Sequence, residues 1–248
     1  MKNRSVAIIP SRLESSRLPN KALKLIEGIP LVIHVLKRCQ LSECLEEVYV
    51  ATDSKEIADI VKTWGGEVIM TSKDHKTGTD RIAEACKEIE AEIILNVQGD
   101  EALVNPKHID TLCKVMESDD SILISILVNK FHKKNSPSDI KVVLNEMNEV
   151  MYFSREDIPS YSRNSGHQML KAYHIVPFRK EFLLKYASWE PTELEKIEFN
   201  EYVRVLEKGY KIKAIEVESS AVSVDTEEDL AVVSKLIKKD PFLELYKN

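Results

Sequence analysis

Two arginines and a lysine follow a short apolar stretch near the start of the chain. The run Val6 to Ile9 ends at Pro10, as expected for a strand buried in a sheet. The polar stretch after it contains Ser11, Arg12, Ser15, Ser16, Arg17 and Lys21. Such a loop at the edge of a parallel sheet commonly holds phosphate oxygens, because arginine offers forked donors and lysine a point charge. The alternative is an ordinary strand followed by a solvated basic loop, and the rest of the chain has to distinguish the two.

Two aspartates are expected at the same edge of the sheet. Asp100 follows the apolar stretch 92–97, and Asp225 follows the last predicted strand, 211–217. Ligands of open α/β sheets bind beyond the carboxyl ends of the strands. Two carboxylates opposite a cationic loop suit Mg²⁺ on a triphosphate, because this hard cation takes carboxylate, phosphate and water oxygens. Each aspartate alone could be a turn or cap residue, whereas both together with the cations favour a site. Other polar groups predicted at this edge are Asp53, Gln98 and Thr77 to Thr79.

Strand and helix patterns alternate through the first ~115 residues. Strands are predicted at 6–9, 47–51, 68–70 and 92–97. The intervening helices are expected to begin at Pro30, Ser54, Thr77 or Thr79, and Pro106, since Ser and Thr are good N-caps and Pro suits the first turn. This alternation predicts an α/β fold with a doubly wound, mostly parallel sheet and right-handed crossovers.

The second half lacks helices long enough to connect parallel strands. The stretches 122–128, 141–144 and 150–153 resemble strands, and 171–179 resembles one strand interrupted by Pro177. A longer helix is expected after Pro191, with Leu194, Ile197, Val203 and Leu206 on its apolar side. We therefore predict one domain over 1–248, with a smaller antiparallel lobe projecting at about 129–190. The region 141–179 is a plausible dimer surface.

Composition limits the classes of partner. The 248 residues carry a formal net charge of -6, which disfavours general attraction to nucleic acid. The start of the chain resembles no signal peptide, and no apolar run approaches the ~18 residues of a membrane span. The four cysteines form no CxxC pair, so we expect buried free thiols rather than a zinc site or disulfides. A cytoplasmic protein without membrane or nucleic-acid partners is predicted.

Several motifs in fixed order give the chain a resemblance to a known family. It resembles the CMP-Kdo synthetases, the 3-deoxy-manno-octulosonate cytidylyltransferases, from Ile8 to about Leu236. The pieces that carry the resemblance are IIPSRLESSRLPNK at 8–21, VYVATD at 48–53, GGEVIMTSKDHKTGTDRIAE at 65–84, NVQGDE at 96–101, KVVL at 141–144, YFSREDIP at 152–159 and VDTEEDL at 224–230. Any single piece would be weak, whereas their combination is specific.

The resemblance implies a magnesium-dependent enzyme in which an acceptor hydroxyl attacks the α-phosphorus of CTP and pyrophosphate leaves. It implies a nucleotidyltransferase sheet with a smaller antiparallel dimerisation lobe, and a homodimer. Asp100 and Asp225 match the metal carboxylates, and Lys21, Arg12 and Asp100 are the expected catalytic residues. The phosphate loop is matched by Arg12, Ser15, Arg17 and Lys21. The nucleoside pocket is matched by Gln98, Thr77, Gly78, Thr79 and Arg81.

The acceptor side departs from the family. The family's usual pattern HxGIYGY is replaced by AYHIVPF at 172–178, where Ala172 stands at the His position and Val176 at the first Tyr position. A second family pattern, LEQLR, is replaced by NEYVR at 200–204. Candidate acceptor-binding residues are Arg155, His174, Glu201 and Tyr202. Each has a structural alternative: Arg155 could be a solvated surface arginine, His174 a strand histidine with a hydrogen-bond partner, and Tyr202 a core or interface aromatic residue.

We therefore expect CMP transfer to an acidic acceptor, Kdo or a related 2-keto sugar acid, with plain Kdo a poor substrate because polar contacts to the sugar are lost. One alternative is a cytidylyltransferase that acts on a small phosphonate. Another is a non-catalytic CTP-binding protein, which the cationic loop and both aspartates argue against.

Overall fold

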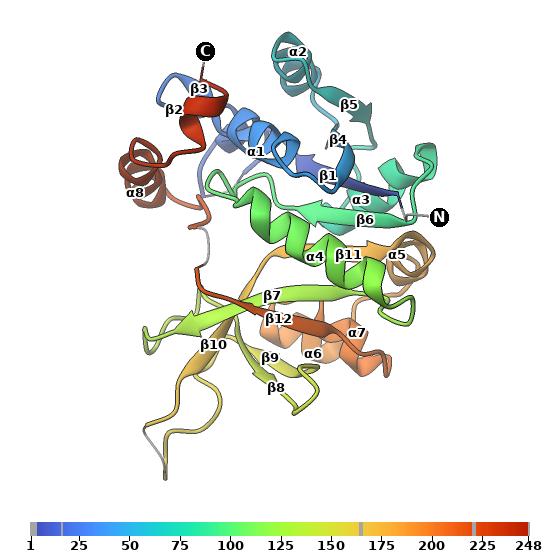
Figure 1. The fold of residues 1–248 in the computed structure, drawn as a ribbon, viewed down its shortest axis with the longest axis vertical. Coiled ribbons are helices and arrows are strands. Elements are labelled where there is room, and N and C mark those ends of the chain that lie inside the picture. The colour runs from blue at the N-terminus through green and yellow to red at the C-terminus, as the bar shows by residue number, and fades with distance from the viewer. Residues whose placement is uncertain (1–3, 16, 164–165, 220–221, 248) are drawn as a thin grey trace.

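Five strands form a central sheet in the order β11-β6-β1-β4-β5. The computed structural model describes residues 4–15, 17–163, 166–219 and 222–247. Strands β1 (Ser5–Ser11), β4 (Leu45–Thr52), β5 (Glu67–Met70) and β6 (Ile93–Val97) are parallel, and β11 (Ile175–Arg179) runs antiparallel to β6 at one edge. Every residue of the central strand β1 is buried. The predicted doubly wound, mostly parallel α/β sheet is confirmed (Figure 1).

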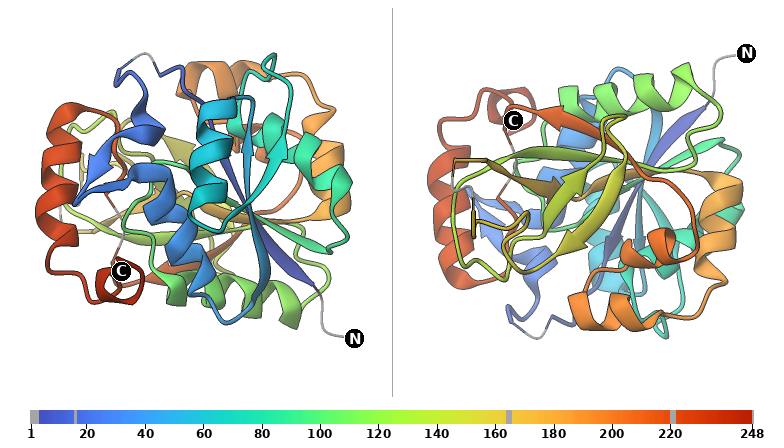
Figure 2. Two further views of the ribbon diagram at one scale, coloured as in Figure 1. Left: turned by 90° about the horizontal axis from the view of Figure 1, so that it is seen from above. Right: turned by 90° about the horizontal axis from the view of Figure 1, so that it is seen from below.

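Helices cover both faces of this sheet (Figure 2). Ala7 and Ile9 of β1 pack with α1 (Leu31–Gln40), α2 (Lys55–Thr63) and α4 (Pro106–Ser118). Val6 and Ile8 face the other way and pack with α3 (Gly78–Ala85) and α5 (Lys180–Ala187). Alternate residues of a strand point to opposite faces, so β1 contributes to two hydrophobic clusters. Ser54, Thr77 and Asn105 accept backbone hydrogen bonds as N-caps of α2, α3 and α4.

A second five-stranded sheet lies beside the first, in the order β12-β7-β10-β8-β9. It contains β7 (Ser125–Phe131), β8 (Lys141–Leu144), β9 (Val150–Ser154), β10 (Met169–Tyr173) and β12 (Lys213–Val217). All neighbouring pairs are antiparallel except β12 and β7, which are parallel. The division into one domain with a projecting lobe at 129–190 stays a prediction.

The stretch 171–179 is two strands, and the prediction of one strand was wrong. Residues up to Tyr173 belong to β10 in the second sheet, and Ile175 begins β11 in the first. His174 alone separates them. Pro177 is tolerated because β11 is the edge strand of the first sheet, and its outer side meets the chain through the isolated bridge between Ile124 and Phe178 and not through a continuous ladder.

The helix expected after Pro191 is also divided. It forms α6 (Glu193–Glu198) and α7 (Val203–Glu207), because Phe199 adopts a left-handed conformation with φ 49° that ends α6. Ile197 is 71% exposed, so its assignment to an apolar side was wrong. Leu194 is likewise exposed.

The remaining elements are short or lie near the C-terminus. Helix α8 (Glu227–Ile237) packs against β2 (Leu25–Ile26), which pairs with β3 (Ile29–Pro30). Three 3₁₀ helices occupy Lys21–Leu23, Cys86–Glu88 and Leu243–Leu245. Within the described ranges, no helix has the length and apolar character needed to cross a membrane.

A disulfide joins Cys44 to Cys113, so the expectation of free thiols was wrong for this pair. The turn after α1 carries Cys44 onto α4, where Asp110 accepts hydrogen bonds from the backbone N–H groups of Glu43 and Cys44. The two cysteines are 69 residues apart, and no local spacing shows that they meet. Cys39 and Cys86 are buried free thiols, as expected.

Candidate functional site

A cavity of about 280 Å³ opens at the carboxyl ends of β1 and β6. The predicted site residues that line it are Arg12, Ser15, Arg17, Lys21, Thr77, Gly78, Arg81, Gln98, Asp100 and Asp225. Residues from the start, the middle and the end of the chain therefore meet at the sheet edge where ligands of this fold class bind. Ser16 of the predicted loop lies outside the described residues.

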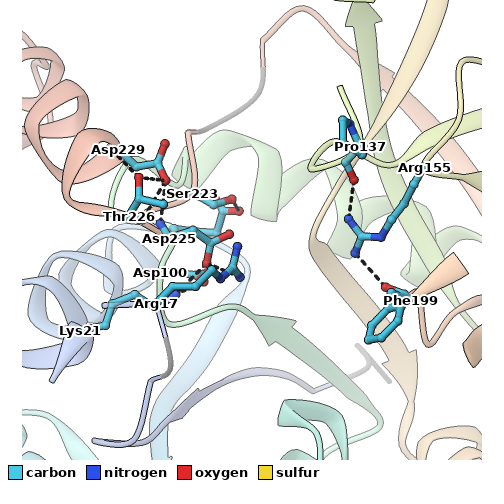
Figure 3. A network of polar contacts seen from close by, with 11 residues as sticks. Arg17, Lys21, Asp100, Pro137, Arg155, Phe199, Ser223, Asp225, Thr226 and Asp229 are labelled. Carbon is cyan, nitrogen blue, oxygen red and sulfur yellow. Dashed lines mark hydrogen bonds and ion pairs between the residues drawn. The ribbon is translucent and has the colours of Figure 1, made fainter. Parts of the chain in front are cut away.

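Lys21 joins the two predicted carboxylates. Its Nζ lies 2.6 Å from Oδ2 of Asp100 and 3.1 Å from Oδ1 of Asp225. Arg17 Nη2 lies 3.0 Å from the same Asp225 oxygen (Figure 3). Burial by itself lowers the pKa of Lys21, but the charges of Asp100 and then Asp225 outweigh it, so the pKa is raised and the amine stays protonated. The cluster is a compact arrangement of alternating charge.

The basic loop and Asp225 are anchored in one small hydrophobic cluster. Leu18, between Arg17 and Lys21, is 1% exposed and packs in a cluster that also contains Val224 and Val233 of α8. The backbone N–H of Val224 donates to the carbonyl oxygen of Asp100 over 3.0 Å. These contacts fix the distance between the loop and the two carboxylates, although more than 200 residues separate Lys21 from Asp225.

Gly99 allows β6 to end against β1. A Cβ atom at this position would lie 2.7 Å from the carbonyl oxygen of Pro10, which is backbone and cannot move aside. Gly78 begins α3 beside the same proline, and a Cβ atom there would lie 3.1 Å from Pro10 Cγ. The two glycines therefore let the loop after β6 and the start of α3 approach the end of β1 and form the cavity wall.

Arg81 and Thr79 extend from α3 in different directions. Arg81 is 3% exposed, lies 3.1 Å from Asp53 and donates to Thr71 Oγ1, so its guanidinium is held at the cavity. Thr79 is fully buried and is absent from the cavity wall; its hydroxyl donates to Glu201 Oε1 over 2.7 Å.

The acceptor candidates lie outside the cavity wall. Arg155 donates to the carbonyl oxygens of Pro137 and Phe199 (Figure 3). It also donates to the carbonyl oxygen of Glu198. Tyr202 is 3% exposed, and the rings of Tyr202 and His174 stack with centroids 6.4 Å apart. Burial lowers the pKa of His174 to about 4, so this imidazole is neutral near pH 7. Their acceptor-binding roles stay predictions.

Sequence reasoning missed two residues near the cavity. His75 lines it and is hydrogen-bonded to Glu84. Asn96 is fully buried behind the wall, and its side chain accepts from Gln98 over 2.8 Å. An Asn in an otherwise apolar strand was the signal that could have identified the second.

The donor set for a metal ion is small. Among the residues that the structure describes, no group of three or more His, Cys, Asp or Glu side chains is arranged to hold a metal. Asp100 and Asp225 supply two carboxylates that converge on one positive charge, the Lys21 ammonium. A hard cation bound there would complete its coordination with oxygens of a ligand and water.

The parallel sheet with a charged cavity at its carboxyl edge is also the architecture of known nucleotidyltransferases, and the comparisons below identify this chain as an enzyme of that class. A solved structure of CMP:2-keto-3-deoxy-manno-octonic acid synthetase complexed with CTP matches with a TM-score of 0.92 at 34% identity, covering 95% of this chain and 99% of that chain. A cytidylyltransferase from Leptospira borgpetersenii shares the fold, with a TM-score of 0.66 at 20% identity, covering 99% and 93% of the two chains.

Sequence comparison identifies the family. The cytidylyltransferase family model matches residues 6–214. The 3-deoxy-manno-octulosonate cytidylyltransferase of Geotalea daltonii is 39% identical over 246 residues, covering 94% of this chain and 97% of the relative. That of Fusobacterium nucleatum is 38% identical over 239 residues, covering 95% and 97%. The chain belongs to the cytidylyltransferase family, among the 3-deoxy-manno-octulosonate cytidylyltransferases, which confirms the resemblance seen in its motifs.

Proposed function

We propose that the protein catalyses magnesium-dependent transfer of CMP from CTP to a hydroxyl group of a 2-keto sugar acid, Kdo or a close relative, and releases pyrophosphate. The observation that carries this proposal is the Lys21–Asp100–Asp225 cluster at a cavity that Arg12 and Arg17 also line. The relatives named 3-deoxy-manno-octulosonate cytidylyltransferase and the similar structure with CTP support it.

Asp100 and Asp225 are the proposed Mg²⁺ ligands. Their oxygens already hold the Lys21 ammonium between them, so the pair fits a cation. When bound, Mg²⁺ would polarise the phosphate and neutralise its charge. Two protein carboxylates suffice because Mg²⁺ usually keeps several waters and takes substrate phosphate oxygens.

The side chains of Arg12, Arg17 and Lys21 would stabilise the negative charge of the phosphates that the metal ion does not neutralise. During transfer, a bond forms between the acceptor oxygen and the α-phosphorus, and the bond from that phosphorus to the pyrophosphate oxygen breaks. The proton of the acceptor hydroxyl passes to solvent water. Arg12, Arg17 and Lys21 would donate to phosphate oxygens and align the triphosphate. Phosphoryl transfer depends mainly on such alignment and charge stabilisation, without a covalent protein intermediate.

Acceptor recognition is proposed around His174, Glu201 and Tyr202, with Arg155 adding positive charge. The His174 ring stacks on Tyr202, whose hydroxyl lies 3.4 Å from Nδ2 of Asn96, the side chain that accepts from Gln98 of the cavity wall. These contacts support a position close to the cavity. The family's two polar positions hold Ala172 and Val176, which are 1% and 0% exposed. Since these core side chains offer no polar contact, a small phosphonate acceptor is the second candidate.

Pyrophosphate release from CTP tests the proposal. Plain Kdo, other 2-keto sugar acids and small phosphonates would be offered with Mg²⁺, and we expect turnover with a sugar acid, loss with a chelator and recovery with added Mg²⁺. The variant Asp100→Asn should lower turnover at least ~10²-fold. The exposed Asp59→Asn on α2 is the matched control and should retain activity. Turnover only with phosphonates would favour the second candidate, and no release with any acceptor would contradict both.

A further inference from the structure

A second cavity, of about 340 Å³, lies apart from the candidate site, and among the described residues the two have no wall residue in common. It is enclosed by the end of α1, the start of α4, the end of β10 and the segment that follows α8. Its volume accommodates a small molecule. We call it the Arg38 cavity, after one of the charged and polar residues that line it: Arg38, His108, Tyr173, Lys239 and Asp240.

The hydroxyl group of Tyr173 is an unused donor at this cavity. The residue is 2% exposed, and its Oη has no hydrogen-bond partner among the described residues. Burial raises the pKa of Tyr173 well above its usual range, and the backbone N–H of Asn105 opposes this shift only in part. The hydroxyl group therefore keeps its hydrogen. Because a buried donor without an acceptor is costly and uncommon in folded proteins, this group indicates a ligand that accepts a hydrogen bond.

The guanidinium group of Arg38 is also incompletely used, although the residue is fully buried. Its Nε donates to Tyr246 Oη over 3.2 Å, and its Nη1 donates to the carbonyl oxygen of Val104 over 3.1 Å. Its Nη2 lies 2.8 Å from Asp240 Oδ1 but has no partner in hydrogen-bond geometry within the described ranges. The N–H groups of Nη2 therefore remain available to a second acceptor.

His108 lies between these two groups in the fold. It is on the first turn of α4, four residues after Val104, and its ring meets that of Tyr173 edge-on with centroids 5.8 Å apart. Burial lowers the pKa of His108, so the imidazole is neutral near pH 7. Its Nδ1 is buried and, in the described part of the chain, makes no hydrogen bond. Three elements thus bring three unused polar groups to one cavity.

The charge and the apolar walls of the Arg38 cavity define the class of ligand. Arg38 and Lys239 bring two positive charges and Asp240 one negative charge, while His108 is neutral. This balance and the unused donors favour an anion, and a carboxylate can take several N–H and O–H donors at once. An apolar group on the same ligand would contact the remaining hydrophobic walls, which include Leu103, Leu236 and Phe242.

We propose that the Arg38 cavity is a binding site for a small organic anion, a carboxylate attached to an apolar group. The carboxylate accepts from the Tyr173 hydroxyl group and from Nη2 of Arg38. The site is separate from the candidate site, and its occupation does not depend on the proposed transfer of CMP.

Equilibrium binding of benzoate, measured by ligand-observed NMR at pH 7, tests the proposal. Benzamide has nearly the same shape without the charge, and we expect benzoate to bind at least ~5-fold more tightly. Tyr173→Phe should weaken benzoate binding at least ~5-fold, because one hydrogen bond to a charged group is lost. The thermal midpoint of the free variant should be unchanged or higher, since the deleted hydroxyl group has no partner there. A clear loss of stability would contradict this assignment.

Asp240→Asn tests the charge of the ligand. The variant's amide oxygen can still accept from the backbone N–H of Phe242, as Asp240 Oδ1 does over 2.9 Å, whereas Arg38 loses its negative partner. Benzoate affinity should rise at least ~5-fold and benzamide affinity should stay the same. An equal change for both ligands would count against an anion site.

Two further variants are the controls. Tyr49→Phe also removes one hydroxyl group, which donates to Glu47 over 2.6 Å on β4, outside the Arg38 cavity, and should bind benzoate like the wild type. Arg12→Ala removes a cation of the candidate site and should likewise leave the affinity unchanged. Weaker binding in Arg12→Ala but not in Tyr173→Phe would place benzoate in the candidate site and overturn the inference. Absence of benzoate binding would overturn it too, and neither result would affect the test of pyrophosphate release.

Discussion

At the scale of single residues, Lys21 is the centre of the candidate site. Among the described residues, it is the one side chain that hydrogen-bonds to both Asp100 and Asp225. Its position depends on Leu18, whose burial fixes the loop three residues earlier. In the proposed reaction, Lys21 would exchange its contacts with the two carboxylates for contacts with the phosphate oxygens of CTP.

We expect Lys21→Met to lower kcat/KM for CTP by ~10²–10³-fold, because a positioned donor to the phosphate charge is lost. The measurement is pyrophosphate release under saturating acceptor. Lys24→Met is the matched control: Lys24 forms an exposed pair with Glu227 at 2.8 Å, and such pairs contribute ~1 kcal/mol or less. Equal losses in the two variants would contradict the role of Lys21.

Glu201 should make stability depend on pH. Burial raises its pKa to about 7, above the ~4.3 of an unfolded chain. The folded state therefore retains a proton that the unfolded state loses, so this group's contribution to the unfolding free energy falls as pH rises from ~4.3 to ~7. Urea unfolding from about pH 5 to pH 8 should show Glu201→Gln gaining stability relative to the wild type as pH rises. Parallel pH curves for the two proteins would contradict this.

At the scale of elements, the amino-acid sequence predicts the parallel strands and helices of the first ~115 residues well. Strand and helix patterns there are separated by clear caps and turns, and β1, β4, β5 and β6 lie where apolar stretches indicate. The hydrophobic pattern did not predict the strand ends where apolar residues continue from one strand into the next. The stretch 171–179 is apolar on both sides of His174, so nothing local shows that the chain changes sheets there. Phe199 likewise ends α6 in a left-handed conformation that a Gly or Asn would have signalled.

The residues of the candidate site also fall into those that the sequence predicts and those that it does not. Side chains in the loops after strands, such as Arg12 and Asp100, were predictable because the fold class itself places them at one edge. The contacts of Glu201 and Arg155 could not be predicted, because they depend on how the segment of α6 and α7 packs against β9 and α3. Pairing of Cys44 with Cys113 was hidden for the same reason.

The Cys44–Cys113 bond ties the turn after α1 to α4. Closing a loop of this length, 69 residues, can contribute up to about 4 kcal/mol by restricting the unfolded chain. We expect a reductant to lower the thermal midpoint of the oxidised wild type. Cys113→Ser should be insensitive to reductant, whereas Cys86→Ala should keep the response because Cys86 is a free thiol. An unresponsive wild type, shown to be oxidised by thiol titration, would contradict the prediction.

At the scale of the whole molecule, a homodimer formed through the second sheet stays a prediction. Strand β9 is at the edge of that sheet, and Met151 on it is 63% exposed. Met151→Asp should shift the protein toward monomer in sedimentation experiments, because a charge would be buried at the contact. Met70→Asp is the control, since Met70 is 53% exposed on β5, the edge of the other sheet. A monomeric wild type, or equal effects of both variants, would contradict the assignment.

The passage of the chain through His174 has a consequence for folding cooperativity. One residue joins β10 to β11, and Ile124, just before β7, forms a bridge with Phe178 of β11. If β10 detaches from the second sheet, the position of β11 in the first sheet is disturbed as well, and the reverse is also true. The two halves should therefore melt in a single calorimetric transition, and a ligand that stabilises the cavity should protect amide hydrogens in the distant sheet against exchange.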